Sequence, residues 1–200
     1  MNLSLPALSA CVSGRWQLSI GDPDVLGWSV FGLYILAGVL AVAALTRGAF
    51  PESHRRRDQT LWALIAALMI AVGLNKQLDL QSLANAVGHC LSQAQGWYED
   101  RRVAQRDFIL LLALLSCAGA ALLIWMLKGR VRANLLPLAG LAALVGFVLV
   151  RGMHLLHLFV TEEGLADVAV HSLTETLEIL SPALITLAAW RLLRRRQARG

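Results

Sequence analysis

Long apolar stretches, separated by short polar ones, run along the whole chain. Five segments are dominated by apolar residues: about 25–46, 61–80, 108–127, 135–160 and 168–190. Each is close to the roughly 20 residues that a helix needs to cross the hydrocarbon core of a bilayer. No period-two alternation runs long enough to suggest the strands of a barrel. The pattern predicts an all-α integral membrane bundle of five transmembrane helices, in a single transmembrane domain over residues 1–200.

Composition supports a membrane location. Hydrophobic residues make up 57% of the chain and charged residues 16%, and the mean hydropathy is +0.61. Soluble domains are closer to half apolar and a quarter charged. These values exclude a disordered chain, a nucleic-acid-binding domain and an ordinary soluble enzyme. Membrane lipids are therefore expected partners, and nucleic acid is not.

Charge predicts one orientation of the five helices. The connections after segments one and three and the tail after segment five hold twelve basic and two acidic residues, a charge of +10, whereas the remaining ends sum to −5. Positively charged loops stay in the cytoplasm. We therefore expect a multi-pass protein of the bacterial inner (cytoplasmic) membrane, with its N-terminus outside and its C-terminus cytoplasmic. The pI of 9.7 then reports orientation rather than nucleic-acid binding.

The longest predicted connection is the outside loop 81–107. At its start Leu80, Leu83, Val87 and Leu91 follow helical spacing. This spacing predicts an amphipathic helix at the membrane surface, or an extension of the second segment.

The three cysteines have different expected environments. The topology places Cys11 and Cys90 outside, where the oxidising compartment permits a single bridge. Sequence does not show whether their Cα atoms come close enough for one, and two free thiols are our expectation. Cys117 lies well inside the third segment, and we expect it to be buried.

Polar residues gather near the outer end of every predicted helix. Counted at about 1.5 Å per residue from the point of entry, three helices place polar groups there: Asn75, Lys76 and Asp79; Arg151, His154 and His157; and His171, Glu175 and Glu178. On the same side, Asp22 and Asp24 precede the first segment, and Arg101 and Arg102 precede the third. A charged side chain at mid-bilayer costs about 2.5–3.5 kcal/mol. These groups must therefore face each other, a water-filled cavity or a ligand.

A metal site is the first interpretation of this cluster. His154, His157 and His171 form a plausible ligand set for zinc or iron. Such a metal would lower the pKa of a bound water and drive ester or amide hydrolysis. Glu175 or Asp79 would then act as the general base.

Two other interpretations stay open. Histidines on segments four and five suit the axial ligands of a b-type haem, or a quinone head group at the same depth. Alternatively there is no cofactor, and the cluster is an ion-pair network in a structural or accessory subunit of a membrane complex. Whether the protein is an enzyme stays open as well.

The combined expectation is a site for a lipid-like ligand that enters from the side. Arginine suits the geometry of phosphate and carboxylate groups. The residues expected to bind the ligand, including an anionic head group, are Lys76, Asn75, Arg151, Arg101, Arg102 and Glu178.

Three motifs carry a resemblance to a known family. They are Gly-Asp-Pro at 21–23 with Gly27-Trp28, the run Asn75 to Gln81, and Gly96-Trp97-Tyr98 with Arg101-Arg102. Over most of its length the chain resembles a family of small bacterial polytopic inner-membrane proteins to which no activity is assigned. A more distant analogy links it to the alkaline-ceramidase type of intramembrane hydrolase, which has seven spans and an HxxxH pair. Here there are five spans and the pair is HxxH.

Overall fold

The computed structural model is built from helices. It describes residues 5–17, 20–155 and 165–197, and this part of the chain contains no strand. The α-helices are α1 (Leu5–Ser13), α2 (Val25–Arg47), α3 (Arg55–Leu78), α4 (Leu80–Gln95), α5 (Arg101–Met126), α6 (Leu135–Leu155) and α7 (Leu165–Gln197).

Five helices in the described residues, namely α2, α3, α5, α6 and α7, are long and apolar enough to cross a membrane. The all-α prediction and the five apolar helices are confirmed. The helix boundaries differ from the apolar segments: α3 already begins at Arg55, α5 at Arg101, and α7 continues to Gln197. Hydropathy falls where a helix becomes polar, but long charged side chains are good helix formers. The helices therefore continue beyond their apolar stretches.

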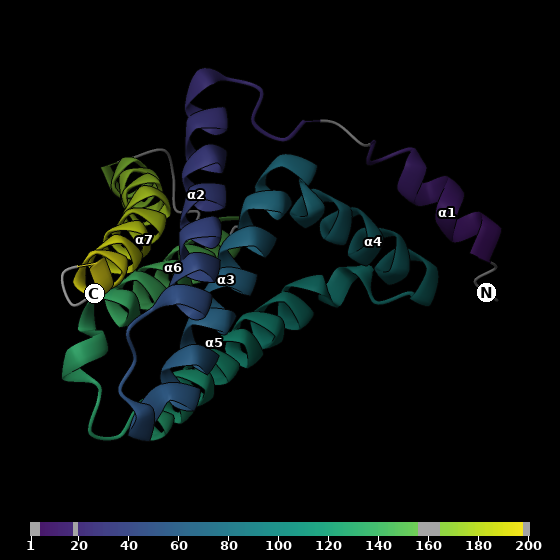
Figure 1. Ribbon diagram of the computed structural model, residues 1–200. Helices are drawn as coiled ribbons and strands as arrows, with labels where there is room; N and C mark the ends of the chain where they lie inside the picture. The colour runs from purple at the N-terminus through teal and green to yellow at the C-terminus, as the bar shows by residue number, and fades with distance from the viewer. Residues whose placement is uncertain (1–4, 18–19, 156–164, 198–200) are drawn as a thin grey trace.

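Four helices share one core. Helix α2 packs against α3 and α7, and α7 packs against α6, as the central group in Figure 1 shows. Tyr34, Ile65, Met69 and Ile185 are fully buried there. Consecutive helices run in opposite directions. As a result α2 begins, α3 ends, α6 ends and α7 begins at one end of the bundle, here called the polar end.

Helix α5 lies at the edge of this core. It contacts α6, and almost none of its apolar stretch is buried in the protein. Cys117 is exposed, so the prediction of a buried thiol is wrong. The position of a residue along a membrane-spanning helix determines only how far that residue lies from the bilayer surface. Burial within the protein depends on which face turns towards the bundle.

The chain before α2 forms an arm with α4. Helix α1 packs against α4, and Cys11 and Cys90 form a disulfide, so the expectation of two free thiols is wrong. The loop predicted over 81–107 contains a helix, α4, and Ala86 and Cys90 on it are buried. Figure 1 shows α1 and α4 extending to one side of the bundle. Part of the apolar face of α4 is therefore covered by α1.

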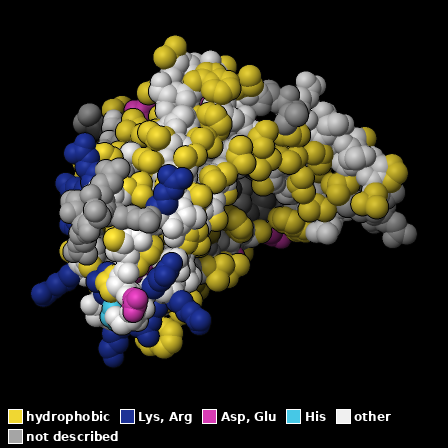
Figure 2. Space-filling view, viewed as in Figure 1, with side chains coloured by type: hydrophobic (Ala, Val, Ile, Leu, Met, Phe, Trp, Pro, Cys, Tyr) yellow, Lys and Arg dark blue, Asp and Glu magenta, His cyan; other side chains and the backbone are white. Residues whose placement is uncertain are grey.

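The opposite end, here called the basic end, contains a second polar network. Figure 2 shows lysine and arginine side chains gathered there, at the lower left, and apolar side chains over much of the helix surface above. Asp58 is buried and accepts hydrogen bonds from Nη2 of Arg130 at 3.0 Å and from Nδ2 of Asn134 at 3.2 Å. By hydropathy alone, Asp58 belongs to the connection after the first apolar segment. In the structure it lies on α3 and ties that helix to the α5–α6 connection.

Candidate functional site

Lys76 is the centre of the polar end. Its Nζ donates to Oε1 of Glu178 on α7 at 2.8 Å and to Oδ2 of Asp22, which precedes α2. The side chains of Lys76 and Glu178 are 9% and 11% exposed, and that of Asp22 is 39% exposed. One ammonium group thus joins three segments that are far apart in the sequence.

Backbone contacts with the end of α3 and the N-cap of α2 hold the segment before α2 in place. The N–H of Gly21 donates to the carbonyl of Gln77 at 2.9 Å. A Cβ at Gly21 would lie 2.4 Å from the Lys76 carbonyl oxygen, so only glycine fits this close approach. Asp24 is the N-cap of α2, and its Oδ1 accepts from the N–H of Gly27 at 2.6 Å. These contacts place Asp22 beside Lys76.

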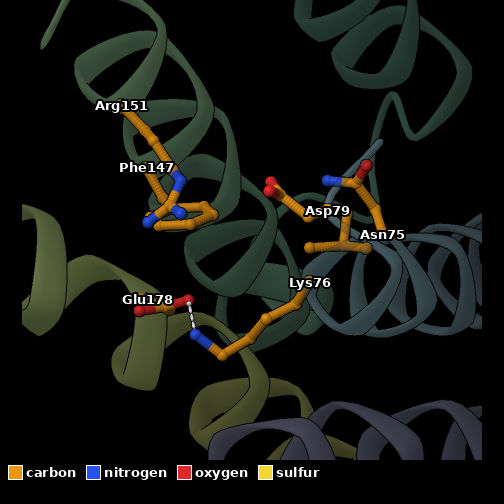
Figure 3. Close-up of a pocket in the computed structure, with 7 residues that line it drawn as sticks. Asn75, Lys76, Asp79, Phe147, Arg151 and Glu178 are labelled. Atoms are coloured by element: carbon orange, nitrogen blue, oxygen red, sulfur yellow. Dashed lines mark hydrogen bonds and ion pairs between the residues drawn. The ribbon is translucent and has the colours of Figure 1, made fainter. Parts of the chain in front are cut away.

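Asp79 marks the corner between α3 and α4. Its φ of 47° is in the left-handed region, which aspartate tolerates better than most residues. It lines a small cavity of about 20 Å³ together with Asn75, Lys76, Arg151 and Glu178. Figure 3 shows these side chains, from α3 and its C-terminal end, α6 and α7, around the Lys76–Glu178 pair. The guanidinium of Arg151 lies over the Phe147 ring, 5.9 Å from its centre.

A larger cavity of about 210 Å³ shares Lys76, Arg151 and Glu178 with the small one. Its charged lining is four carboxylates and two cations: Asp22, Asp24, Glu175, Glu178, Lys76 and Arg151. Apolar side chains complete the wall, including Leu26, Val30 and Ile179. Leu26 and Ile179 are also exposed on the outside of the bundle. The cavity therefore connects a charged interior to an apolar helix surface.

The predicted metal ligands are only partly described. His171 lines the larger cavity, and its Nε2 lies 3.2 Å from Oε1 of Glu175; both side chains are exposed. The described residues contain no group of three or more His, Cys, Asp or Glu side chains that would hold a metal ion. The side chain of His154 and the whole of His157 lie outside the described residues. The zinc, iron and haem b interpretations therefore stay predictions.

The two arginines that precede the third apolar segment have a different position. Arg102 is exposed on α5 and lines neither cavity. The side chain of Arg101 lies outside the described residues. The structure thus brings together Asn75, Lys76, Asp79, Arg151, Glu178, Glu175 and His171, and it leaves Arg102 apart.

Two carboxylates of the site were given no role from the sequence. Asp22 and Asp24 were placed on the correct side of the bundle, but nothing in their spacing links them to a lysine in α3. The Gly-Asp-Pro-Asp run before an apolar helix is the signal in the sequence that points to them. In addition, the hydroxyl of Tyr34, at the centre of the core, is buried and has no hydrogen-bond partner among the described residues.

Chemically, the polar end offers carboxylates and cations within one cavity, beside an apolar surface. This arrangement suits an ionic or zwitterionic group attached to an apolar tail. Comparison of the chain with family models, curated proteins and solved structures finds no match.

Proposed function

We propose that this membrane protein binds a lipid-like amphiphile, with the polar head group in the larger cavity and the apolar chains along the helix surface. The observation that supports the proposal best is the lining of that cavity. Charged groups from α3, α6, α7 and the segment before α2 occupy its interior, whereas Leu26 and Ile179 stand at the apolar surface. An amphiphile has the same two-part character.

The size of the cavity agrees with a head group. Its 210 Å³ is below the roughly 300–1,000 Å³ of pockets that enclose a drug-sized ligand. A whole lipid does not fit inside. A head group fits, and its acyl chains then continue beside Leu26 and Ile179, where exposed apolar side chains are solvated by lipid.

The polar end belongs to the outer leaflet in this proposal, with the N-terminus outside and the C-terminus in the bacterial cytoplasm. The basic loops at the other end support this orientation. Single cysteines in a Cys117→Ser background test it, with Cys11 and Cys90 left paired. A membrane-impermeant maleimide applied to intact cells should label Gln95→Cys and spare Arg56→Cys. The reverse pattern would place the cavity in the cytoplasmic leaflet.

Blocking the apolar side of the cavity tests ligand binding. Ile179 and Leu180 are neighbours on α7 and are both 41% exposed, but only Ile179 lines the cavity. Ile179→Trp should fill the entrance without removing a charge, and Leu180→Trp is the matched control. Purified variants are compared by mass spectrometry of the lipids and other amphiphiles that they retain.

We expect the parent and Leu180→Trp to retain the same amphiphile and Ile179→Trp to lose most of it. Equal retention by all three proteins would contradict binding at this cavity. Thermal unfolding of the three proteins is measured in parallel, so that a folding defect in Ile179→Trp is recognised.

A second candidate is a structural subunit in which the polar end is an ion-pair network. The observation that favours it is the contact of buried Lys76 with both Asp22 and Glu178. In that case none of the proteins retains an amphiphile above the level of bulk detergent. Neutralising the network would then change stability alone.

A further inference from the structure

We infer that the head group in the larger cavity carries an ammonium group, as in a zwitterionic phospholipid with a primary amine. The inference rests on the proposed function and replaces the anionic head group expected from the sequence with one that also carries a positive charge. There, an anionic head group was expected to meet Lys76 and several arginines.

The lining of the larger cavity carries an excess of negative charge. The described lining residues carry four carboxylates against the cations of Lys76 and Arg151, a formal charge of −2 with His171 neutral. Arg102, one of the cations expected to attract an anion, lines neither cavity. A purely anionic head group would add negative charge to a cavity that already has an excess of it. A low-dielectric site makes such like-charge contacts expensive.

The ammonium group of Lys76 is largely neutralised by its neighbours. Its ammonium already contacts two carboxylates, Asp22 and Glu178. An ammonium has three N–H donors, so at most one is left for a ligand. Lys76 therefore contributes little net positive charge to the cavity. A single phosphate oxygen beside its third N–H and the guanidinium of Arg151 is compatible with this arrangement.

The carboxylates of Glu175 and Glu178 are placed to accept hydrogen bonds from an ammonium group. Glu175 and Glu178 are three residues apart on α7, so they lie on the same face of the helix, and both line the cavity. Oε1 of Glu178 accepts from Lys76, whereas Glu175 contacts His171 rather than a lysine or arginine among the described residues. An ammonium group at this face meets carboxylate oxygens with charge-assisted hydrogen bonds. Its phosphate then lies towards Arg151.

A lipid competition experiment tests the inference. Purified protein in detergent is mixed with equal amounts of phosphatidylethanolamine, phosphatidylcholine and phosphatidylglycerol that have the same acyl chains. Native mass spectrometry counts the lipids that stay bound. Glu175→Gln keeps the size of the side chain and removes its charge. Glu99→Gln is the matched control, because Glu99 is exposed and lines neither cavity.

We expect the parent and Glu99→Gln to retain phosphatidylethanolamine in preference to both other lipids. Glu175→Gln should reduce this preference about tenfold or more, the scale of a single charge-assisted hydrogen bond. Displacement of the bound lipid by excess soluble phosphoethanolamine would support recognition of the head group itself.

Two results would overturn the inference and leave the proposed function standing. One is preferred retention of phosphatidylglycerol by the parent. The other is a preference for phosphatidylethanolamine that Glu175→Gln does not change. Retention of no lipid at all, with equal behaviour of Ile179→Trp and Leu180→Trp, would contradict the proposed function as well.

Discussion

Replacement of Lys76 by methionine isolates the energetic role of the ion-pair network. Methionine keeps an unbranched side chain of similar length and removes the ammonium. Glu178 then keeps its carboxylate at a buried position without the cation that it contacts at 2.8 Å. Asp22 also loses its cation, but its side chain is 39% exposed and water solvates it.

The expected cost follows from these exposures. Removing one partner of a buried ion pair costs roughly 3–5 kcal/mol, because the remaining charge stays buried and uncompensated. An exposed pair is worth about 0–1 kcal/mol. The Lys76–Glu178 contact belongs to the first class and the Lys76–Asp22 contact lies nearer the second. We therefore expect Lys76→Met to lower the free energy of unfolding by about 3 kcal/mol, and Asp22→Asn by about 1 kcal/mol.

Reversible unfolding by sodium dodecyl sulfate in mixed micelles, followed by tryptophan fluorescence, measures these changes. The double variant Lys76→Met with Glu178→Gln completes a double-mutant cycle. Since it removes the orphaned carboxylate together with the ammonium, it should be more stable than Lys76→Met alone. The coupling energy should exceed about 1 kcal/mol, within the range found for residues in contact.

A loss below about 1 kcal/mol for Lys76→Met, together with a coupling energy near zero, would refute the reasoning. It would mean that water reaches Glu178 as freely as it reaches Asp22 and that the pair is solvated. In that case the network could not stabilise the bundle.

Three further predictions concern other parts of the molecule. Gly140→Ala should cost roughly 1–3 kcal/mol through overpacking, because its Cβ would lie 2.7 Å from Cγ1 of buried Ile185. The control Gly119→Ala, with nothing within 4 Å of its Cβ, should be neutral or stabilising by up to about 1 kcal/mol. Equal effects of the two substitutions in the same unfolding assay would be inconsistent with the α6–α7 contact. Asp58→Ala should cost about 2 kcal/mol, since buried Asn134 loses one of its two acceptors and Arg130 loses its counter-ion; an unchanged unfolding midpoint would show that this network adds nothing. Cys90→Ser should lower stability by up to about 4 kcal/mol in the chain-entropy model, since the bridge spans a sequence separation of 79; alkylation of both cysteines in unreduced parent protein would show that no bridge forms.

The candidate site was predicted in outline because depth follows from sequence. Lys76, Arg151 and Glu178 lie at comparable distances from the ends of their apolar stretches, so antiparallel helices bring them to one level. Their pairing was not predictable. Asp22 is 54 residues before Lys76 and Glu178 is 102 residues after it. Their contact depends on how α2, α3 and α7 are rotated and how closely they pack.

The net charge of the cavity lining was not predictable from the sequence either. Counting charges near the outer ends includes Arg102, which the structure leaves on α5 away from both cavities. It includes Asp22 and Asp24 without showing that they turn into the site. Position along each helix groups the charges at one end of the bundle, but only the rotation of each helix selects the residues that face the cavity.

Sequence alone determined the number and approximate position of the apolar helices, and which of their ends are polar. Hydropathy and charge are local properties, and each apolar stretch must form its own backbone hydrogen bonds whatever its neighbours are. Tertiary structure decided that α5 stays at the edge, that Asp58 is buried, that Cys11 meets Cys90, and that Lys76 lies between two carboxylates. These outcomes depend on which helix faces come into contact. Apolar side chains surround most of each helix, and lipid is as apolar as the core, so hydrophobicity does not distinguish a packed face from a lipid-facing one.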